Sequence, residues 1–335
     1  MNSGVLLFLK LKTDNLDTSE SEIKLQYIVF YNIENLFDIY DDELTNDDDF
    51  LPTSAKKWTK KRYRNKIFKV GSVISKIGFD IAKKPPALIG LAEVENSLVL
   101  TDLIQSQELM QYNYGFVHHD SPDDRGIDVA LLYDKDEFKV ESSEIFTLYL
   151  ETLEGERDYT RDILWVHGSL DGEPIHVIVN HWPSRRDGEE VTSYKRMIAS
   201  KKVLEIILKI KVQFQDPKII VIGDFNDNPN DSSIQHLINN EELYNSTERL
   251  WTRDRGSLNH DFQWKLFDQI LISKNLMKPN QNGYHFDFAN IFDEKFVTQF
   301  HGKYKGQPFR TYVGKKYMGG FSDHFPVYAV LKKNK

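Results

Sequence analysis

Residue types that can bind metals or move protons recur in this sequence where apolar runs begin or end. The pattern occurs in YIVFYNIEN, PALIGLAEVEN, PIHVIVNHWPSRR, KIIVIGDFND and GGFSDHFPV, while WKLFDQILIS carries an aspartate inside such a run. A lone Asn or Asp after a strand usually caps a turn. Six coincidences in one chain favour one shared site instead. The candidate residues are Asn32, Glu34, Glu93, His181, Arg185, Asp224, Asn226, Asp268, Asp323 and His324.

Three of these candidates differ in how strongly each, taken alone, indicates a functional role. Glu93 follows Leu88–Ala92 directly, so its carboxylate lies at the edge of a core. Asp268 stands among apolar neighbours in a strand-like run, where a charge should be paired or should bind a metal. His181 by itself fits a satisfied structural histidine as well as a functional one.

The set as a whole favours hydrolysis of a phosphoester. Oxygen ligands without thiolates suit a hard ion such as Mg²⁺ or Mn²⁺ rather than structural zinc. Two histidines with separate carboxylates suit acid–base work, and an arginine beside one of them is a forked donor for phosphate. A phosphate-binding P-loop and a dinucleotide fingerprint are both absent from the sequence. Metal-assisted attack of water on a phosphoester combines these features.

Composition limits the class of protein. The chain has 335 residues, of which 40% are hydrophobic and 13% aromatic, which is enough for a sizeable core. Its net charge of −8 argues against a general binder of polyanions, although a local basic cleft stays compatible with it. The sequence has no cysteine, which excludes disulfides and thiolate metal sites.

The beginning of the chain resembles neither a signal peptide nor an anchor. The apolar patch Val5–Leu9 is interrupted by lysines and lacks a basic segment before it. No run approaches the ~18 apolar residues of a membrane span. We expect residues 1–24 to form a flexible extension, and we expect a soluble protein that is cytoplasmic rather than secreted.

Elements that would position the candidate residues can be read from the apolar patterns. Short β-branched and aromatic runs predict strands, and amphipathic spacing predicts helices over Ala55–Ile77, Leu98–Met110 and Glu189–Lys211, the last burying Met197, Leu204, Ile207 and Leu208. Strands outnumber helices without regular alternation, which favours two packed sheets flanked by helices in one domain, residues 25–332. The predicted strands are Tyr27–Tyr31, Ala87–Ala92, Tyr114–Val117, Val129–Tyr133, Ile163–Val166, Ile175–Val179, Ile219–Ile222, Phe267–Ile272 and Val327–Leu331.

Two charged runs give weaker signals. The acidic stretch 38–50 lacks the glycine and terminal glutamate of an EF-hand loop, so a solvated loop is the better interpretation. The basic run 56–66 could contact phosphate, but a solvated helix face is more common.

The ordered series NIEN, LAEVEN, RGIDVALLYD, NHWPSR, GDFND, DQILIS and GGFSDHFPV resembles the endonuclease/exonuclease/phosphatase superfamily, metal-dependent hydrolases related to pancreatic-type deoxyribonuclease. NIENLFD followed by EVEN also resembles a bacterial branch of predicted nucleases. The resemblance covers nearly the whole chain. It implies an α+β fold: a four-layer α/β/β/α sandwich of two packed, mainly antiparallel sheets flanked by helices, with the site at one rim.

The resemblance also implies roles. Glu93 matches the principal metal ligand for Mg²⁺ or Mn²⁺, with Asn32, Glu34 and Asp323 completing the sphere. Asp224 matches the residue that aligns or deprotonates water. The other matches are Asn226 as a phosphate ligand, His324 as the imidazole that contacts the scissile phosphate, Asp268 as the carboxylate that orients it, and His181 as the second histidine.

Several matches leave alternatives open. Arg185 and Arg186 both follow the histidine motif and either could grip phosphate, and we assign Arg185. Asp128 could support His181 or end a turn, and Arg310–Tyr312 could line the cleft.

The reaction is better defined than the substrate. We expect a nuclease-like phosphodiesterase acting on DNA or RNA, with Lys56–Lys66 as a candidate local groove. The alternative is a phosphatase or phosphodiesterase of a lipid or small phosphoester, although the charged stretch 149–159 disfavours a membrane-acting enzyme. A catalytically idle scaffold is the third possibility, disfavoured by the intact set of polar residues. Oligomeric state is not indicated.

Overall fold

The structure is a computed structural model that describes residues 23–152, 154–186, 188–241, 243–279 and 283–334. The extension expected at the N-terminus lies outside the described residues except for its last two, which already belong to the first strand. The assignment of residues 25–332 to one domain stays a prediction.

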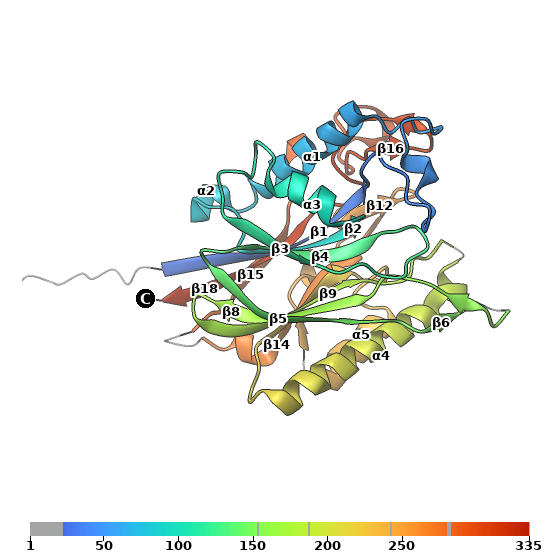
Figure 1. Cartoon of the computed structure of the whole chain (residues 1–335). Coiled ribbons are helices and arrows are strands. Elements are labelled where there is room, and N and C mark those ends of the chain that lie inside the picture. Colours follow the sequence, from blue (N-terminus) through green and yellow to red (C-terminus); the bar gives the residue numbers. More distant parts are fainter. Residues whose placement is uncertain (1–22, 153, 187, 242, 280–282, 335) are drawn as a thin grey trace, which may run out of the picture.

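Two six-stranded sheets form the centre of the molecule (Figure 1). In both sheets one parallel pair is flanked by antiparallel neighbours, so each sheet is mixed and mainly antiparallel. In spatial order the first sheet contains β15 (His285–Ile291), β18 (Val327–Asn334), β1 (Ile23–Leu36), β2 (Leu88–Val94), β4 (Asp128–Asp134) and β3 (Tyr114–His118). The second contains β11 (Leu243–Asn245), β14 (Asp268–Ser273), β10 (Ile219–Asp224), β9 (Glu173–His181), β8 (Ile163–Leu170) and β5 (Phe138–Phe146).

Helices cover the outer face of each sheet, as Figure 1 shows with α1 and α3 above and α4 and α5 below. The expected four-layer α/β/β/α sandwich is therefore confirmed. The helices are α1 (Lys60–Ile74), α2 (Phe79–Ala82), α3 (Ser97–Ile104), α4 (Glu189–Gln213) and α5 (Ser232–Glu241). Three small hairpins are added: β6 (Leu150–Glu151) with β7 (Arg157–Asp158), β12 (Leu258–His260) with β13 (Gln263–Lys265), and β16 (Tyr312–Val313) with β17 (Lys316–Tyr317).

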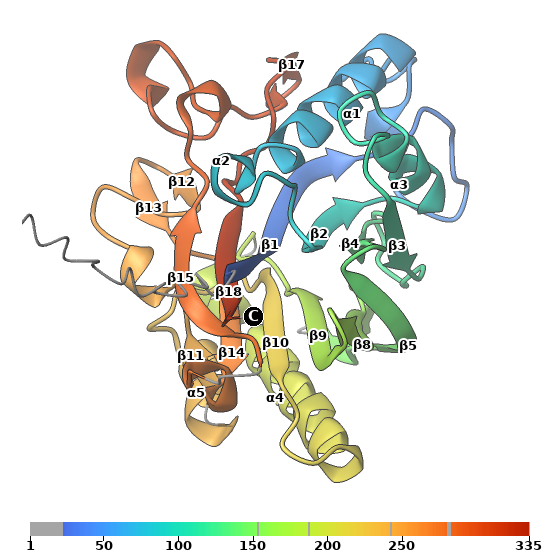
Figure 2. The same cartoon turned by 90° about the vertical axis from the view of Figure 1, so that its left-hand side faces the viewer.

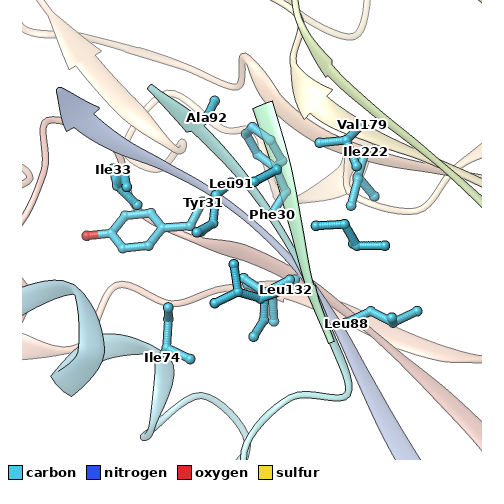
Figure 3. Close-up of a cluster of buried hydrophobic side chains, with 14 of the residues drawn as sticks. Phe30, Tyr31, Ile33, Ile74, Leu88, Leu91, Ala92, Leu132, Val179 and Ile222 are labelled. Atoms are coloured by element: carbon cyan, nitrogen blue, oxygen red, sulfur yellow. The ribbon is translucent and has the colours of Figure 1, made fainter. Parts of the chain in front are cut away.

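The alternation of side chains along β1 builds two apolar layers at once. Phe30 points toward Val179 and Ile222 of the second sheet, whereas Tyr31 points toward Ile74 of α1 (Figure 3). Because successive side chains of a strand face opposite sides, one buried strand feeds both layers. Gly90 on β2 keeps the sheets close, since a Cβ there would lie 2.6 Å from the Ile222 side chain.

All nine predicted strands are present, and the predicted helices need correction. The first starts at Lys60 and ends at Ile74, and the second ends at Ile104 rather than at Met110. In helix α4, Ile207 is buried as predicted and Met197 and Leu204 are half-buried, but Leu208 is 53% exposed and Arg196 is buried. The Arg196 charge is buried because its Nε lies 2.6 Å from the Asp227 carboxylate.

Within the described residues, no helix has both the length and the apolar character required to cross a bilayer.

Candidate active site

The strand pairing brings the predicted site residues to one rim of the sandwich. The parallel pairs β1–β2 and β9–β10 end there, which places Asn32, Glu93, His181 and Asp224 together. Strands β14 and β18 run antiparallel to their neighbours, so they start at the same rim. Asp268 is the first residue of β14, and Asp224 pairs with it across the ladder.

Asp224 lies at the centre of the residues gathered at this rim. Asn32 Nδ2 donates to its Oδ2 at 3.0 Å and lies 3.5 Å from Glu93 Oε1. Both histidines point their Nε2 atoms at the same Oδ2, His181 from 3.8 Å and His324 from 4.0 Å. Burial and the neighbouring Asp268 carboxylate raise the pKa of Asp224 to about 6.

His324 is held by its other ring nitrogen. Its Nδ1 lies 2.7 Å from Asp268 Oδ2, and both side chains are buried. Although burial favours the neutral ring, the carboxylates of Asp268, Asp224 and Asp323 raise the pKa of His324 well above its usual range. The Ser322 hydroxyl accepts from the His324 amide and donates to the Asn32 carbonyl, which ties this segment to β1. The Asp268 carboxylate therefore fixes the orientation of the His324 ring and favours its protonated form.

His181 is in the opposite situation. It is buried, and its Nδ1 has no hydrogen-bond partner among the described residues. Burial and the cations Arg161 and Arg125 lower the pKa of His181 well below its usual range. Asp128, a possible supporting residue for His181, bonds His118 Nε2 at 3.0 Å instead.

The residues of the rim fit a hard divalent ion. Glu93 takes a positive φ of 66°, and its Oε2 accepts from the Asn35 amide at 2.9 Å, while Oε1 lies 4.0 Å from His181 Nε2. Asp268 Oδ1 is buried and lacks a partner among the described atoms. The side-chain oxygens of Asp224 and Asp268 also lie close together, within 4.8 Å of each other and of a His324 ring nitrogen. A cation near this many oxygens would offset their mutual repulsion.

Glu34 stands apart from the other predicted metal ligands. Its carboxylate is buried and accepts from the amides of Thr311 and Tyr312, at 2.5 and 3.4 Å. The buried Lys66 ammonium donates to Thr311 Oγ1 at 2.6 Å. Burial raises the pKa of Glu34, and the nearby Lys66 opposes this shift. Glu34 therefore anchors the segment 311–312, and its geometry gives no support to a ligand role.

Asp323 lies beside the rim with a cationic partner. Its Oδ2 is 2.5 Å from Arg310 Nη2, and its Oδ1 is 4.0 Å from His324 Nε2. Although burial opposes ionisation, His324 and Arg310 hold the pKa of Asp323 below its usual value. The Asp323 carboxylate thus stays ionised, and its Oδ1 atom is directed toward the site.

A pocket of about 270 Å³ opens over these groups. The arginines that line it are Arg125, Arg161 and Arg186, and the predicted phosphate ligand Arg185 is not among them. Its guanidinium bonds the Asn226 carbonyl at 2.6 Å and the carboxylates of Asp227, Asp231 and Glu189. The pocket is lined by Asn32, Glu93, Asp123, Asp124, Arg125, Tyr159, Arg161, His181, Ser184, Arg186, Asp224, Asn226 and His324.

Arg125 and Arg161 were not selected from the sequence. Arg125 directly precedes the glycine of RGIDVALLYD, so that motif contained a usable signal. Arg161 lies next to the charged 149–159 stretch, and no sequence motif marked it as a candidate. It is buried, and its guanidinium bonds Asp123 at 3.2 Å and the Trp182 carbonyl at 2.7 Å.

Asn226 lines the pocket from a left-handed backbone, with φ of 49°. Its amide donates to Asp224 Oδ1 at 2.9 Å, and its Nδ2 donates to the Trp182 carbonyl at 2.9 Å. These bonds explain why the GDFND turn holds Asp224 and Asn226 side by side.

The two charged runs are largely solvated. Lys57, Lys60, Lys61 and Arg64 are exposed, while Arg62 stacks on the Tyr317 ring at 4.4 Å. Of the run 56–66, no residue lines the pocket, so its geometry does not support a groove at the site. In the acidic run, Asp38 and Asp47 are buried and the other acids are exposed.

Comparison with known proteins gives one family and several similar folds. The family model described as "Endonuclease/Exonuclease/phosphatase family" matches residues 27–333. No curated protein sequence matches the chain.

Solved structures with the same fold have low sequence identity. An endonuclease/exonuclease/phosphatase family protein from Bacteroides thetaiotaomicron is 16% identical, with a TM-score of 0.59, covering 93% of this chain and 98% of its own. A mannosyl-6-phosphatase from the same organism is 16% identical, with a TM-score of 0.57 and coverage of 91% and 99%. TDP2 from C. elegans is 14% identical, with a TM-score of 0.57 and coverage of 92% and 76%.

Proposed function

The chain belongs to the endonuclease/exonuclease/phosphatase family of phosphoester hydrolases, and we propose that it is a divalent-metal-dependent, nuclease-like phosphodiesterase that uses in-line attack of water. The observation that carries this proposal is the arrangement around Asp224. One ionisable carboxylate faces a neutral imidazole and a charged imidazole, with Glu93 and Asn32 within reach.

Asp224 is the proton acceptor in this proposal. A carboxyl group with a pKa near 6 is ionised at neutral pH yet basic enough to take a proton from an attacking water. Asn32 and the Asn226 amide hold its two oxygens in place. Asn226 also lines the pocket and can orient a phosphate oxygen.

The two imidazoles divide the remaining work. His324, charged and fixed by Asp268, stabilises the negative charge that builds up on the phosphoryl oxygens. His181, neutral at the opposite side of Asp224, can donate a hydrogen bond to the leaving oxygen. Arg125, Arg161 and Arg186 supply further positive charge along the pocket, in place of Arg185.

Mg²⁺ or Mn²⁺ would be held by Glu93 and Asp323, and by Asn32 once its amide turns the oxygen, which now accepts from the Glu34 amide, toward the ion in place of Nδ2. When bound, such an ion neutralises the phosphate charge and polarises the bond to be broken. The oxygen-only donor set and the partnerless Asp268 Oδ1 support a hard cation at this rim.

The second candidate is a phosphatase of a small phosphoester. The fold similarity to a Bacteroides thetaiotaomicron mannosyl-6-phosphatase favours it, and a pocket of about 270 Å³ would admit a compact substrate. A phosphodiester is preferred because the rim continues past Asp323 into a second hollow.

The test is a substrate panel with controlled metal content. Single-stranded DNA, plasmid DNA, RNA, bis(p-nitrophenyl) phosphate and p-nitrophenyl phosphate are incubated with Mg²⁺, Mn²⁺ or EDTA. Glu93→Gln changes the proposed metal ligand itself. Loss of a residue that only supports a metal ligand typically costs about 10–100-fold, so Glu93→Gln should lower the rate by more than about 100-fold. Glu248→Gln, at an exposed glutamate outside the pocket, is the matched control.

Three outcomes would contradict parts of the proposal. Hydrolysis in EDTA, or full activity of Glu93→Gln, would refute the metal assignment. Cleavage of the monoester alone would favour the phosphatase. No hydrolysis of any substrate, together with no binding of divalent ions, would favour an idle scaffold.

A further inference from the structure

A second hollow lies next to the catalytic rim and is not used by the proposed chemistry. It has a volume of about 310 Å³ and is formed between the β12–β13 hairpin and the segment that precedes β16. Figure 2 shows both elements on one side of the molecule, outside β15 and β18. Asp323 and Arg310 form its boundary with the catalytic rim.

Two exposed aromatic rings line this hollow. Phe262 is 58% exposed and Tyr304 is 43% exposed. Their rings are parallel within 2°, with centroids 5.6 Å apart, and the Lys303 ammonium lies 4.8 Å from the Tyr304 centroid. We call Phe262, Lys303 and Tyr304 the aromatic shelf. Large apolar rings left in solvent next to a catalytic site indicate a surface that binds a ligand.

The backbone under Phe262 is strained. Asp261 and Phe262 are the two central residues of the hairpin turn, with φ values of 49° and 62°. Such a turn strongly prefers glycine or asparagine, because both positions need positive φ. A bulky aromatic residue there is an outlier, and strained backbone of this kind clusters at functional sites. The chain presents a ring at a position where glycine would relieve the strain.

The shelf is rigidly connected to the catalytic centre. Leu258 forms a β-bridge with His324, and the Phe325 amide donates to the Ser257 carbonyl at 2.7 Å. Beyond Leu258 the strand continues for two residues, roughly 7 Å, before the turn that carries Phe262. The rings therefore lie within reach of a group attached to the scissile phosphate.

Charge directs an extended anionic substrate toward the shelf. Beyond the other end of the catalytic pocket, past Asp123 and Asp124, lies a hollow of about 610 Å³ rich in carboxylates. Its acidic lining residues are Asp38, Asp41, Asp42, Glu95, Asp120, Asp123, Asp124 and Asp128. The hollow beside the shelf is lined by only two acids, Asp261 and Asp323, together with Arg310, and the exposed Lys303 and Lys305 belong to the adjoining segment. A polyanion is therefore repelled less from the shelf side than from the acidic side.

We propose that the aromatic shelf stacks an unpaired base of single-stranded nucleic acid, the substrate class of the catalytic rim, with Lys303 contacting the adjacent phosphate. This inference rests on the proposed phosphodiesterase function. Flat aromatic surfaces beside cations bind single strands with little sequence preference, because every base has a π-face. A duplex keeps its bases stacked on each other and cannot use such a surface.

The binding test uses a short single-stranded oligonucleotide that carries 2-aminopurine, whose fluorescence falls when the base stacks. The full chain is titrated in EDTA, so that binding is measured without hydrolysis. Wild type should quench the fluorescence, and the Phe262→Ala, Tyr304→Ala double variant should bind roughly 10-fold or more weakly. Phe300→Ala is the matched control, because Phe300 is an exposed aromatic of the same segment that does not line the hollow.

A second variant separates binding from folding. Phe262→Gly removes the ring and also relieves the positive-φ strain, so its Tm should not fall. Weaker binding at unchanged or higher Tm supports the shelf. Unchanged quenching in both variants would overturn it.

A kinetic comparison distinguishes this inference from the proposed function. On a single strand with bases, the double variant should raise KM about 10-fold and keep kcat, while an otherwise identical abasic strand should show no change. If wild type stacks the strand but hydrolyses no nucleic acid, the proposed function fails and the shelf stands. If wild type cleaves both strands equally well and the variants match it, the shelf fails and the function stands.

Discussion

His324 and His181 approach the same oxygen of Asp224 from two sides, and their surroundings drive their pKa values in opposite directions. Both rings are buried, so burial favours the neutral form of each. The difference comes from the second ring nitrogen. That of His324 meets Asp268 at 2.7 Å, whereas that of His181 has no partner among the described residues, and the positive charges of Arg161 and Arg125 oppose protonation of the His181 ring.

This contrast shows that the surroundings of the Nδ1 atom, rather than the residue type or its depth, set the direction in which the pKa of each histidine moves. The two strand-end motifs look alike in sequence, yet one provides a fixed positive charge and the other a neutral ring. In the proposed mechanism Asp224 acts as the base, and burial and the Asp268 carboxylate raise its pKa toward neutrality.

The largest effect on activity is expected for substitution of Asp224, the carboxylate that both histidines face. Asp224→Asn keeps the shape but removes the proton acceptor, so kcat should fall about 10³–10⁴-fold. Asp231→Asn, at a half-exposed carboxylate that bonds Arg185, is the control and should lose little activity. Steady-state rates with saturating Mg²⁺ measure both. A loss of less than 10-fold for Asp224→Asn would show that another group accepts the proton.

The next effect separates the two imidazoles. His324→Gln removes a fixed positive charge, and we expect a loss of about 10²–10³-fold in kcat. His181→Gln can still donate a hydrogen bond, so its loss should be smaller. Rates on a diester with a poor leaving group and on one with a good leaving group discriminate the roles, because only His181→Gln should depend on the leaving group. The reverse pattern would exchange the assignments.

Asp268→Asn should make the pKa of His324 more similar to that of His181. Loss of the carboxylate lowers the pKa of His324, so the alkaline limb of the kcat profile should move to lower pH, with a loss of about 10–100-fold at neutral pH. The acid limb, set by Asp224, should also move to lower pH, because the Asp268 carboxylate is one of the two causes that raise the pKa of Asp224. An alkaline limb that does not move would mean that Asp268 does not hold the charge of His324.

The smallest effect is on stability, and it has opposite signs for the two residues. The folded-state pKa of His324 is raised, so its stabilisation is full below the unfolded value of about 6.5 and is lost as pH rises through the folded pKa. The folded-state pKa of His181 is lowered, so its contribution is present above about 6.5 and is lost as pH falls.

Urea unfolding at pH 5 and pH 8 measures this difference. His324→Gln should destabilise more at pH 5 than at pH 8, by on the order of 1–2 kcal/mol. His181→Gln should be closest to neutral, or stabilising, at pH 5. Equal effects of either substitution at both pH values would contradict the assigned pKa directions.

The sequence predicted the central strands because short apolar runs rich in β-branched residues have few other uses. It missed β5, whose residues alternate between half-buried and exposed, and β15, which lies at the other sheet's edge. Edge strands carry fewer apolar residues and lack that signal. Helix α5 was also missed, although its ten residues carry an amphipathic pattern comparable to that of α1.

The candidate site was predictable where residues are placed by the end of a strand, as for Asn32, Glu93 and His181. It was not predictable where the outcome depends on distant partners. Arg185 is turned away by Asp227 and Asp231, more than 40 positions along the chain. Glu34 is drawn to the amides of residues 311–312, which adjacency in NIEN could not reveal.

The most direct test of the contrast between the histidines is ¹⁵N NMR of the imidazole nitrogens at pH 7, with His324→Gln and His181→Gln used to assign the two signals. We predict that His324 is protonated on both nitrogens, with one proton on the Asp268 side, and that His181 carries one proton only and stays neutral down to pH 5. Two rings that titrate together near pH 6.5 would contradict the division of roles around Asp224.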